Sequence, residues 1–462
     1  MARAKKEAAL TPEERLQAAL VPDWEWPYKL PENWCWTKIG SISSLHRGVS
    51  YKKTDAHTER RENSCLVMRG GNICEGSINT EADNIYVDIS LVAENQIVRK
   101  NDIIIVASTG STKVIGRAGI SKMDYLDVAF GAFLLLVRPS TKVNQRYIDY
   151  FFLSDNYRNR IKKLASGINI NNIRGEYITE TLVPLAPLAE QQRIVDRIES
   201  LFSKLDEAKE KAQAVVDSFE TRKAAILHKA FTGELTKKWR KSANTRWVYK
   251  KIKDCCKLGS GGTPSRKVPD FYKGDIPWIK TGEIEWNDIY DTEEKITQSA
   301  IDNSSARCYK PGVVLVAMYG MGVTRGKASI LRVQAATNQA VCVLEPQSAL
   351  LYNRYLLYYF MRNYWDIREK AVGGNQLNLS LTIIKELNIE IPPIDEQMEI
   401  VQILDDLFAK EQQAKESAEA VLDQIDLMKK SILARAFRGE LGTNDPSEES
   451  AVELLKEIIR RG

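Results

Sequence analysis

The stretch "PLAEQQRIVDRIESLF" at residues 187–202 returns 206 residues later as "PIDEQMEIVQILDDLF" at residues 393–408. The same register continues without a gap to "AILHKAFTGEL" (225–235) and its counterpart "SILARAFRGEL" (431–441). A fixed register over about 50 residues indicates an internal duplication, and such a repeat decides the architecture before any other feature.

Both copies have the sequence pattern of a long helix. Their apolar residues recur at alternating steps of three and four, which is typical of a coiled-coil seam, interrupted once in each copy, by Arg222 and by Glu411. Each copy ends at a glycine, Gly233 or Gly439, which suits the left-handed position after a helix. We expect two helices of roughly 60 Å that pair antiparallel. The alternative is two independent amphipathic helices, each packed on its own domain.

A segment of about 150 residues precedes each long helix, and the two segments also correspond, more loosely. "WCWTKIGSISSL" from residue 34 matches "WVYKKIKDCCKL" from residue 247, and "DIIIVASTGS" from residue 102 matches "GVVLVAMYGM" from residue 312. Short β-branched runs punctuated by glycine predict strands, and helical stretches follow them. The expected fold class is α+β: two similar domains, each followed by a long α-helix, the helices pairing as an antiparallel coiled coil with pseudo-two-fold symmetry.

These patterns divide the chain into seven parts. The expected order is an N-terminal helical extension (1–33), a first α+β domain (34–186), a first helix (187–235), a basic linker (236–246), a second domain (247–392), a second helix (393–441) and a helical tail (442–462).

Composition narrows the class of protein. The 462 residues carry a net charge of +5, and the positive charge concentrates in the two globular segments and in the linker, which is weakly indicative of a polyanionic partner. Seven cysteines without paired spacing and three scattered histidines favour reduced thiols in a cytoplasm and argue against a metal site. No apolar run is long enough to span a membrane.

Motifs for catalysis are not found. "GMGVTRGK" (320–327) resembles a phosphate-binding loop, but five residues separate Gly320 from Gly326 where four are needed, and Ala328 replaces the Ser or Thr that holds magnesium. Neither a dinucleotide fingerprint nor an amino-methyltransferase tetrad is present. We therefore expect no catalytic residue, no bound cofactor and no metal in this chain.

The order of motifs resembles one known family. Two variable domains, each followed by a helix that opens with P-x-x-E-Q and ends in A-F-x-G-E-L, are similar to the specificity subunit of type I restriction–modification enzymes. "GGTPSRKVPDFYKGDIPWIKTGEI" (261–284) and "LPENWCWTKIGSI" (30–42) resemble the openings of its target-recognition domains. The resemblance covers about residues 30–441.

The resemblance implies a non-catalytic subunit that reads double-stranded DNA. Its two target-recognition domains would read the halves of a bipartite target, while two methyltransferase subunits and restriction–translocase subunits join it. S-adenosylmethionine, ATP and magnesium would then be bound by the partner subunits, in the cytoplasm and without a membrane. Two alternatives remain: the specificity module of a self-contained methyltransferase or nuclease, and a coiled-coil adaptor that binds only protein.

Candidate DNA contacts follow from side-chain chemistry, because Arg and Lys pair with guanine or phosphate while Asn and Gln pair with adenine. The candidates lie in the loops of both globular segments: Arg47, Lys52, Lys53, Arg69, Lys113, Arg117 and Asn169 in the first, and Thr263, Ser265, Arg266, Lys280, Arg325, Lys327, Gln339 and Asn375 in the second.

Overall fold

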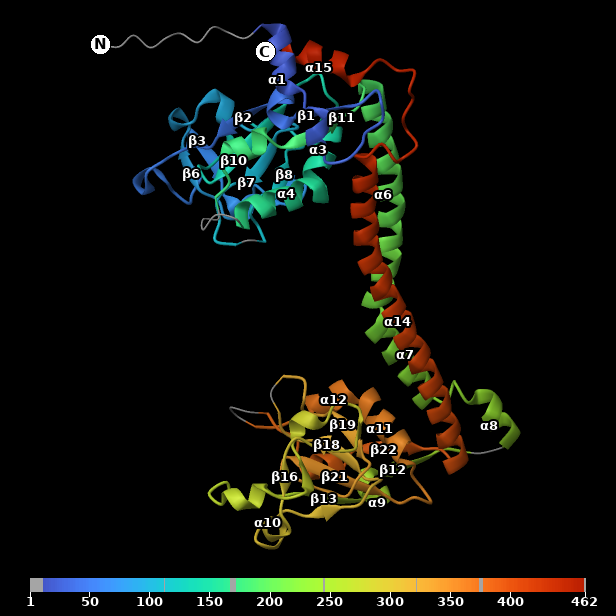
Figure 1. Cartoon of the computed structure of the whole chain (residues 1–462). Coiled ribbons are helices and arrows are strands. Elements are labelled where there is room, and N and C mark those ends of the chain that lie inside the picture. The colour runs from blue at the N-terminus through green and yellow to red at the C-terminus, as the bar shows by residue number, and fades with distance from the viewer. Residues whose placement is uncertain are drawn as a thin grey trace. The chain divides into compact units, whose positions relative to one another are not determined.

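The computed structural model describes residues 11–111, 113–166, 172–243, 246–320, 322–373 and 377–460. The chain divides into two compact units (Figure 1). The first unit comprises Met1–Lys211 and Val421–Gly462, and the second comprises Ala212–Ala420. Each unit therefore contains one globular domain together with parts of both long helices.

The first unit is built around an antiparallel sheet of order β2-β10-β7-β8. Its strand β7 is a run of four β-branched residues that are all buried, as a central strand requires. A second sheet has the order β6-β3-β9, and β1 pairs with β11 at the base of the domain. The strands are β1 (Cys35–Lys38), β2 (Ser43–Arg47), β3 (Ser64–Met68), β4 (Ile73–Cys74), β5 (Ser77–Ile78), β6 (Tyr86–Asp88), β7 (Ile103–Val106), β8 (Ala118–Ile120), β9 (Val128–Phe130), β10 (Leu134–Pro139) and β11 (Leu182–Leu185).

Helices pack beside this sheet, and strand β11 connects them to the long helix (Figure 1). Asn144 caps the helix Gln145–Leu153, because its side chain accepts a hydrogen bond from the Tyr147 amide. The helices of this unit are α1 (Pro12–Ala19), α2 (Ile39–Ile42), α3 (Gln145–Leu153), α4 (Asp155–Ser166), α5 (Gly175–Thr179), most of α6 (Leu188–Asp217), the end of α14 (Ile394–Ala436) and α15 (Ala451–Ile459).

The second unit repeats this plan with few changes. Its main sheet has the order β13-β21-β18-β19-β15, its smaller sheet β16-β14-β20-β17, and its basal pair is β12-β22. Parallel pairing of β14 with β20 matches that of β3 with β9 in the first unit. The strands are β12 (Val248–Lys251), β13 (Cys256–Ser260), β14 (Ile276–Ile279), β15 (Asp288–Ile289), β16 (Lys295–Ile296), β17 (Cys308–Tyr309), β18 (Val314–Ala317), β19 (Ala328–Leu331), β20 (Ala335–Thr337), β21 (Val341–Pro346) and β22 (Asn388–Ile391).

The helices of the second unit follow the same order as those of the first. They are α7 (Phe219–Phe231), α8 (Lys237–Ala243), α9 (Ile252–Cys255), α10 (Gln298–Asp302), α11 (Asn353–Arg362), α12 (Tyr364–Glu369), α13 (Leu381–Lys385) and the first part of α14. Helix α8 lies in the stretch expected to be a basic linker.

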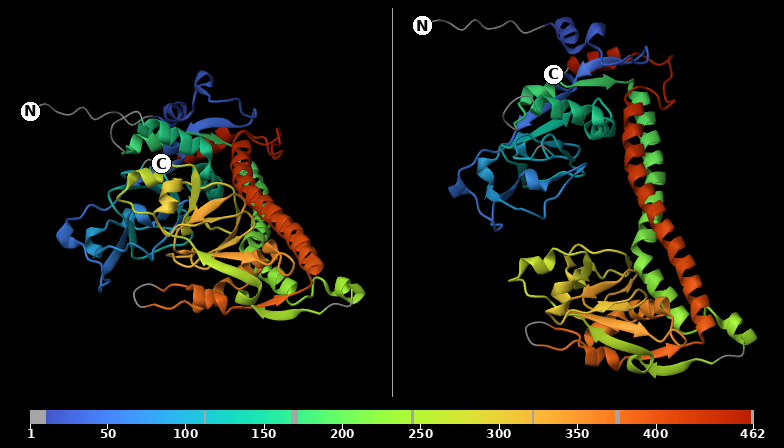
Figure 2. Two further views of the ribbon diagram at one scale, coloured as in Figure 1. Left: turned by 90° about the horizontal axis from the view of Figure 1, so that it is seen from below. Right: turned by 60° about the horizontal axis from the view of Figure 1, so that its bottom comes forward.

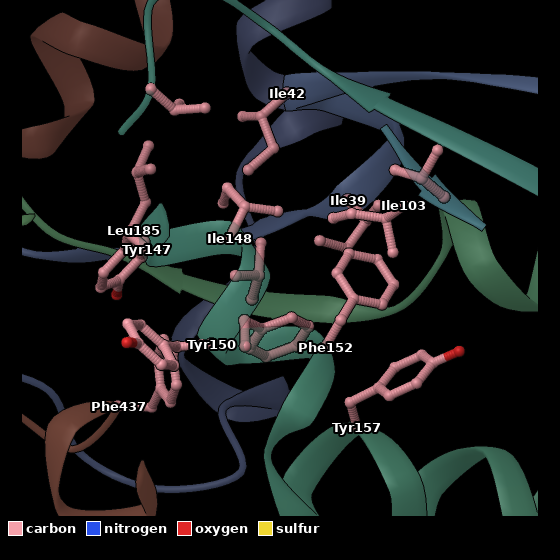
Figure 3. Packing of buried hydrophobic residues seen from close by; sticks show 14 of the residues in the cluster. Ile39, Ile42, Ile103, Tyr147, Ile148, Tyr150, Phe152, Tyr157, Leu185 and Phe437 are labelled. Carbon is pink, nitrogen blue, oxygen red and sulfur yellow. The ribbon is translucent and has the colours of Figure 1, made fainter. Parts of the chain in front are cut away.

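Each domain core contains the end of the long helix that follows the other domain. In the first unit Phe437, at the end of the second helix copy, packs against Tyr147 with ring centroids 5.1 Å apart (Figure 3). In the second unit Phe231, at the end of the first copy, packs against Tyr355 at 4.8 Å. All four rings are at most 2 % exposed, so the A-F motif at each helix end is a core element of the opposite domain.

The repeated Glu-Gln pair at each helix start is fully buried and serves two purposes. Gln191 accepts a hydrogen bond from the Asn144 amide at 2.9 Å, and Gln397 accepts one from the Tyr352 amide at 2.8 Å. These bonds attach each long helix to the start of a domain helix, α3 or α11. The spacing of the P-x-x-E-Q motif thus reflects a fixed junction between domain and helix.

The glutamate of each pair binds residues that follow the end of the other helix copy. Glu190 accepts hydrogen bonds from Trp34 Nε1 at 2.7 Å and from Asn444 Nδ2 at 2.9 Å. Glu396 accepts them from Thr236 Oγ1 at 2.7 Å and Arg240 Nε at 2.9 Å. A buried carboxylate is stable only with such donors. The start of each helix copy is therefore hydrogen-bonded to residues that follow the end of the other copy.

The long helices pair antiparallel within each unit. In the first unit Asp206 binds Lys429 and Lys209 binds Asp426, so residue numbers fall on one helix as they rise on the other. The two helices lie side by side in both views of Figure 2. The fold class expected from the sequence is confirmed as two α+β domains with paired helices.

The two residues that interrupt the seams are partners in the second unit. Arg222 Nε lies 2.7 Å from Glu411 Oε2, and both side chains are largely shielded from solvent.

One expected helix, 187–235, is divided at Ser218 into α6 and α7. The Ser218 hydroxyl donates to the Ala214 carbonyl and accepts from Arg222, which competes with the helical backbone bonds.

The helix ends require glycine. Gly233 and Gly439 have φ of +72° and +74°, and a Cβ at Gly233 would lie 2.1 Å from Arg240.

Among the described residues, no helix is long and apolar enough to cross a membrane.

Candidate nucleic-acid interface

In the first unit, four candidate cations lie at the end of β2 and in the loops that precede and follow β3. Arg47 ends β2, Lys52 and Lys53 follow in the next loop, and Arg69 follows β3. The first three side chains are exposed. Lys53 and Arg69 line a groove of about 540 Å³ together with Tyr51 and Phe133. The groove thus combines cations with aromatic rings, as a nucleic-acid surface requires.

Arg69 is the least available of these cations. Its guanidinium forms an ion pair with Asp83, and both side chains are close to half exposed. An exposed ion pair of this kind is worth little, so an incoming phosphate could replace Asp83 at small cost.

The equivalent loops of the second unit bring Thr263 and Gln339 together. Thr263 Oγ1 donates a hydrogen bond to Gln339 Oε1, across the gap between the loop after β13 and the β20–β21 turn. Both side chains and that of Ser265 are exposed. The hydrogen bond fixes the orientation of the Gln339 amide at the surface.

Arg266 and Lys280 share one carboxylate in this region. Arg266 Nη2 lies 2.7 Å from Glu294, and Lys280 Nζ lies 3.0 Å from the other oxygen of Glu294. The hydrogen bond from Lys280 lowers the pKa of Glu294, and Arg266 lowers it further. Arg266 also stacks over Tyr272 at 4.0 Å, so its planar group is already oriented.

A second pair of loops carries the remaining candidates of the first unit. Lys113 is exposed on the β7–β8 loop, whereas Arg117 is half-buried and donates to the Ile73 carbonyl at 3.1 Å. The neighbouring segment is joined to this loop, since Ile173 donates to the Ala107 carbonyl at 2.7 Å. Asn169 itself lies outside the described residues.

The matching loop of the second unit carries Arg325, which lies against Arg368 of α12. Arg325 donates to the Leu377 carbonyl, and Arg368 Nη1 donates to the Arg325 carbonyl at 2.6 Å. Burial lowers the pKa of Arg325, and the charge of Arg368 lowers it further. A bound phosphate would relieve this repulsion. Lys327 instead forms an ion pair with Glu285 and is only 12 % exposed, and Asn375 lies outside the described residues.

The sequence prediction missed the arginines that hold these loops. Arg158 Nη1 donates to the Ile115 carbonyl at 2.9 Å in the first unit, as Arg368 does to Arg325 in the second. Both arginines lie on the helix pair after the main sheet, α4 and α12. Arg158 is the second residue of "YRNRIKK" (157–163) and Arg368 the fifth of "YWDIREK" (364–370), so the repeat does not align the two arginines and gives no signal that would identify them.

Within the described ranges, no group of three His, Cys, Asp or Glu residues is placed to hold a metal ion.

Comparison with known proteins points to one family. The chain matches the type I restriction modification DNA specificity domain twice, over residues 31–216 and 244–420. It is 29% identical to the specificity subunit of the type I restriction enzyme EcoKI from Escherichia coli, over 93% of this chain and 96% of that one. It is 27% identical to the specificity subunit of StySPI from Salmonella potsdam, with the same coverage.

Solved structures agree on the fold. The HsdS subunit from Thermoanaerobacter tengcongensis superposes with a TM-score of 0.60 at 17% identity, covering 90% of this chain and 99% of that one. A chain from a study of type I restriction–modification complex assembly gives 0.61 at 17% identity, over 90% and 100% of the two chains. At such low identity these likenesses concern architecture alone.

Proposed function

Because this chain belongs to the family of type I restriction modification DNA specificity domains, we propose that it is the DNA specificity subunit of a type I restriction–modification complex. The observation that carries the proposal is the duplication of one loop arrangement. The first unit presents the exposed cations Arg47, Lys52 and Lys53. The second presents the exposed Thr263 hydroxyl and Gln339 amide on the equivalent loops. Duplicated reading surfaces suit a target of two half-sites.

Each unit reads one half of a bipartite double-stranded target, and the paired helices set the gap between the halves. The reciprocal binding of Glu190 and Glu396 supports this role, because each helix start is bound to residues beyond the other helix end.

The partners are two methyltransferase subunits, joined by restriction–translocase subunits. Helix α14 supports protein docking, since Val421, Leu427 and Met428 are exposed apolar side chains on a surface helix. The chain itself is non-catalytic and works in the cytoplasm, where the DNA lies.

S-adenosylmethionine, ATP and magnesium are bound by the partner subunits and not by this chain. The loop that resembles a phosphate-binding loop supports this view, because its lysine, Lys327, is already paired with Glu285 and largely shielded. A phosphate-binding lysine must instead reach its ligand freely.

The test is reconstitution with a methyltransferase subunit. We expect the purified complex to methylate DNA only at a sequence of two half-sites with a fixed gap, and the chain alone to methylate and cleave nothing. Turnover by the chain alone would indicate a self-contained enzyme. A complex without sequence-selective DNA binding would indicate a protein-only adaptor.

A further inference from the structure

One turn of the first unit holds an exposed aromatic side chain on a fixed backbone. Phe133 lies between β9 and β10 and is 68 % exposed. The turn is closed by the Leu134 amide, which donates to the Gly131 carbonyl at 2.9 Å. Amides of Ala107 and Ser108 both donate to the Phe133 carbonyl at 3.0 Å. The ring is therefore presented to solvent by a backbone that has little freedom to move.

Close packing holds the flanks of the same turn. The Gly131 amide donates to the Met68 carbonyl at 2.9 Å, and the Val49 amide donates to the Phe130 carbonyl at 2.7 Å. A Cβ at Gly48 would lie 2.1 Å from the Gly131 carbonyl oxygen, so the two loops touch backbone to backbone. Such contact requires glycine and fixes the relative position of the loops.

The second unit builds the same turn with the same hydrogen bonds. Gly262 donates to Thr337 at 2.9 Å, Asn338 to Ile279 at 3.0 Å, and Met318 to Ala340 at 2.9 Å. These bonds correspond one by one to those from Val49, Gly131 and Ala107. They place Ala340 at the position of Phe133 and Gln339 at that of Ala132.

The two turns thus share one backbone conformation but expose different side chains. Phe133 is mostly exposed, whereas Ala340 is 7 % exposed and the surface of its turn is provided by Gln339. Opposite each turn, Ser50 of the first unit is equivalent to Thr263 of the second, whereas Tyr51 of the first unit is replaced by Pro264. A scaffold that is kept while its exposed side chains change is expected where two sites read different sequences.

Charge identifies the occupant of the groove as DNA. Lys53 and Arg69 line it beside Phe133, and the exposed Lys52 stands next to them. Cations around an apolar ring suit a duplex, whose phosphates lie outside and whose base edges lie inside the groove. This step rests on the proposed function.

We propose that these turns are equivalent base-reading elements in the major groove, in which Phe133 contacts the 5-methyl group of a thymine and Gln339 binds an adenine edge. Thymine is the base that offers a methyl group there, and aromatic side chains make apolar contact with it. The Gln339 amide, oriented by Thr263, pairs with N6 and N7 of adenine. One backbone then reads different bases in the two half-sites.

The experiment begins with the wild-type methyltransferase complex, whose target is read from the methylated sites. If that complex selects no bipartite target, the proposed function fails before this inference is tested. Binding is then measured on duplexes in which deoxyuridine replaces each thymine of both half-sites in turn. We expect one replacement in one half-site to weaken wild-type binding about fourfold, the contribution of one buried methyl-sized group.

The variant Phe133→Ala should bind the thymine duplex about fourfold more weakly and ignore that same replacement. Gln339→Ala should relax selectivity only in the other half-site. The matched control is Leu126→Ala, another exposed apolar residue of the first unit, at 88 % exposure and outside the groove, which should change neither half-site.

Three results would overturn the inference. In the first, Phe133→Ala weakens binding while no deoxyuridine replacement has an effect, which indicates a wedge between bases. In the second, Phe133→Ala affects both half-sites equally, or neither. In the third, the half-site read by the first unit contains no A·T pair.

Discussion

Asp149 is a buried carboxyl group at a position where the second copy has an apolar residue. The offset that relates Tyr147 to Tyr355 places Leu357 at the position of Asp149. Asp149 is 1 % exposed and accepts one hydrogen bond from Arg146 at 3.3 Å. Burial raises the pKa of Asp149 to about 6, against a smaller opposing effect of Arg146.

We predict that Asp149→Asn stabilises the protein at neutral pH. A raised folded pKa means that the folded chain binds more protons than the unfolded chain between pH 3.8 and about 6, so stability falls as pH rises through that window. The gain in free energy of unfolding should be about 2–3 kcal/mol at pH 7.5 and about 1 kcal/mol smaller at pH 5.

Urea unfolding at both pH values measures this difference, with the exposed Glu59→Gln as the control that should stay within about 0.5 kcal/mol. Equal stability of Asp149→Asn and wild type at both pH values would show that the carboxyl group is ionised without cost in the folded chain.

Burial lowers the pKa of Arg325 and the adjacent Arg368 lowers it further. We predict that Arg325 contacts a phosphate, which would relieve the repulsion between the two arginines. Arg325→Ala should weaken binding of the assembled complex on all sequences alike. It should also reduce the slope of log K against log salt by about one. The control is Lys229→Ala, an exposed lysine on α7. An unchanged salt slope together with lost selectivity in one half-site would assign Arg325 to a base instead.

For single residues, the sequence predicts which side chains could bind DNA but not which neighbouring residues they contact. Arg266 and Lys280 are candidate DNA contacts from their side-chain chemistry, but the sequence does not show that both share Glu294, which lies 28 and 14 residues further along the chain. Pairs of this kind depend on loop geometry that no local pattern encodes. Phe133 is not among the predicted contacts, because it opens the apolar run 133–137, which predicts a strand. In the structure the strand begins at Leu134, and the preceding turn exposes Phe133.

Arg222 and Glu411, which interrupt the two helix seams, become partners only when the helices pair. From the sequence, Arg222 and Glu411 are separate defects in two heptad patterns. Antiparallel pairing places them opposite each other, where they form one ion pair. Heptads alone do not fix direction or register, so this pairing could not be predicted.

A double-mutant cycle tests the pair. Arg222→Leu and Glu411→Leu should each lower the free energy of unfolding by about 1–3 kcal/mol, because each leaves an unpaired, partly buried charge. The double variant restores an apolar seam and should approach or exceed wild-type stability. The exposed pair Lys211–Glu207 is the control, with a coupling below about 0.5 kcal/mol. Additive losses in the double variant would contradict the pairing.

For the molecule as a whole, the duplication was predictable and the exchange of helix ends was not. A repeat of 206 residues gives the order of domains and helices directly. It does not reveal that Phe231 enters the core of the second domain and Phe437 that of the first. An A-F pair at a helix end carries no information about its partner until the chain is folded.

We propose that the paired helices set the gap between the two half-sites. The test deletes one heptad from each helix, residues 211–217 and 417–423, which lie between the pairs Lys209–Asp426 and Phe219–Lys415. The seam stays in phase, and each helix shortens by about 10 Å, or at most about three base pairs of DNA.

The measurement is the affinity of the shortened complex for duplexes that carry the wild-type half-sites with every gap length near the original. We predict that both half-sites are retained and that the optimum gap shortens by one to about three base pairs. An optimum at the original gap, or selection of different half-sites, would contradict the claim that the helices measure the target.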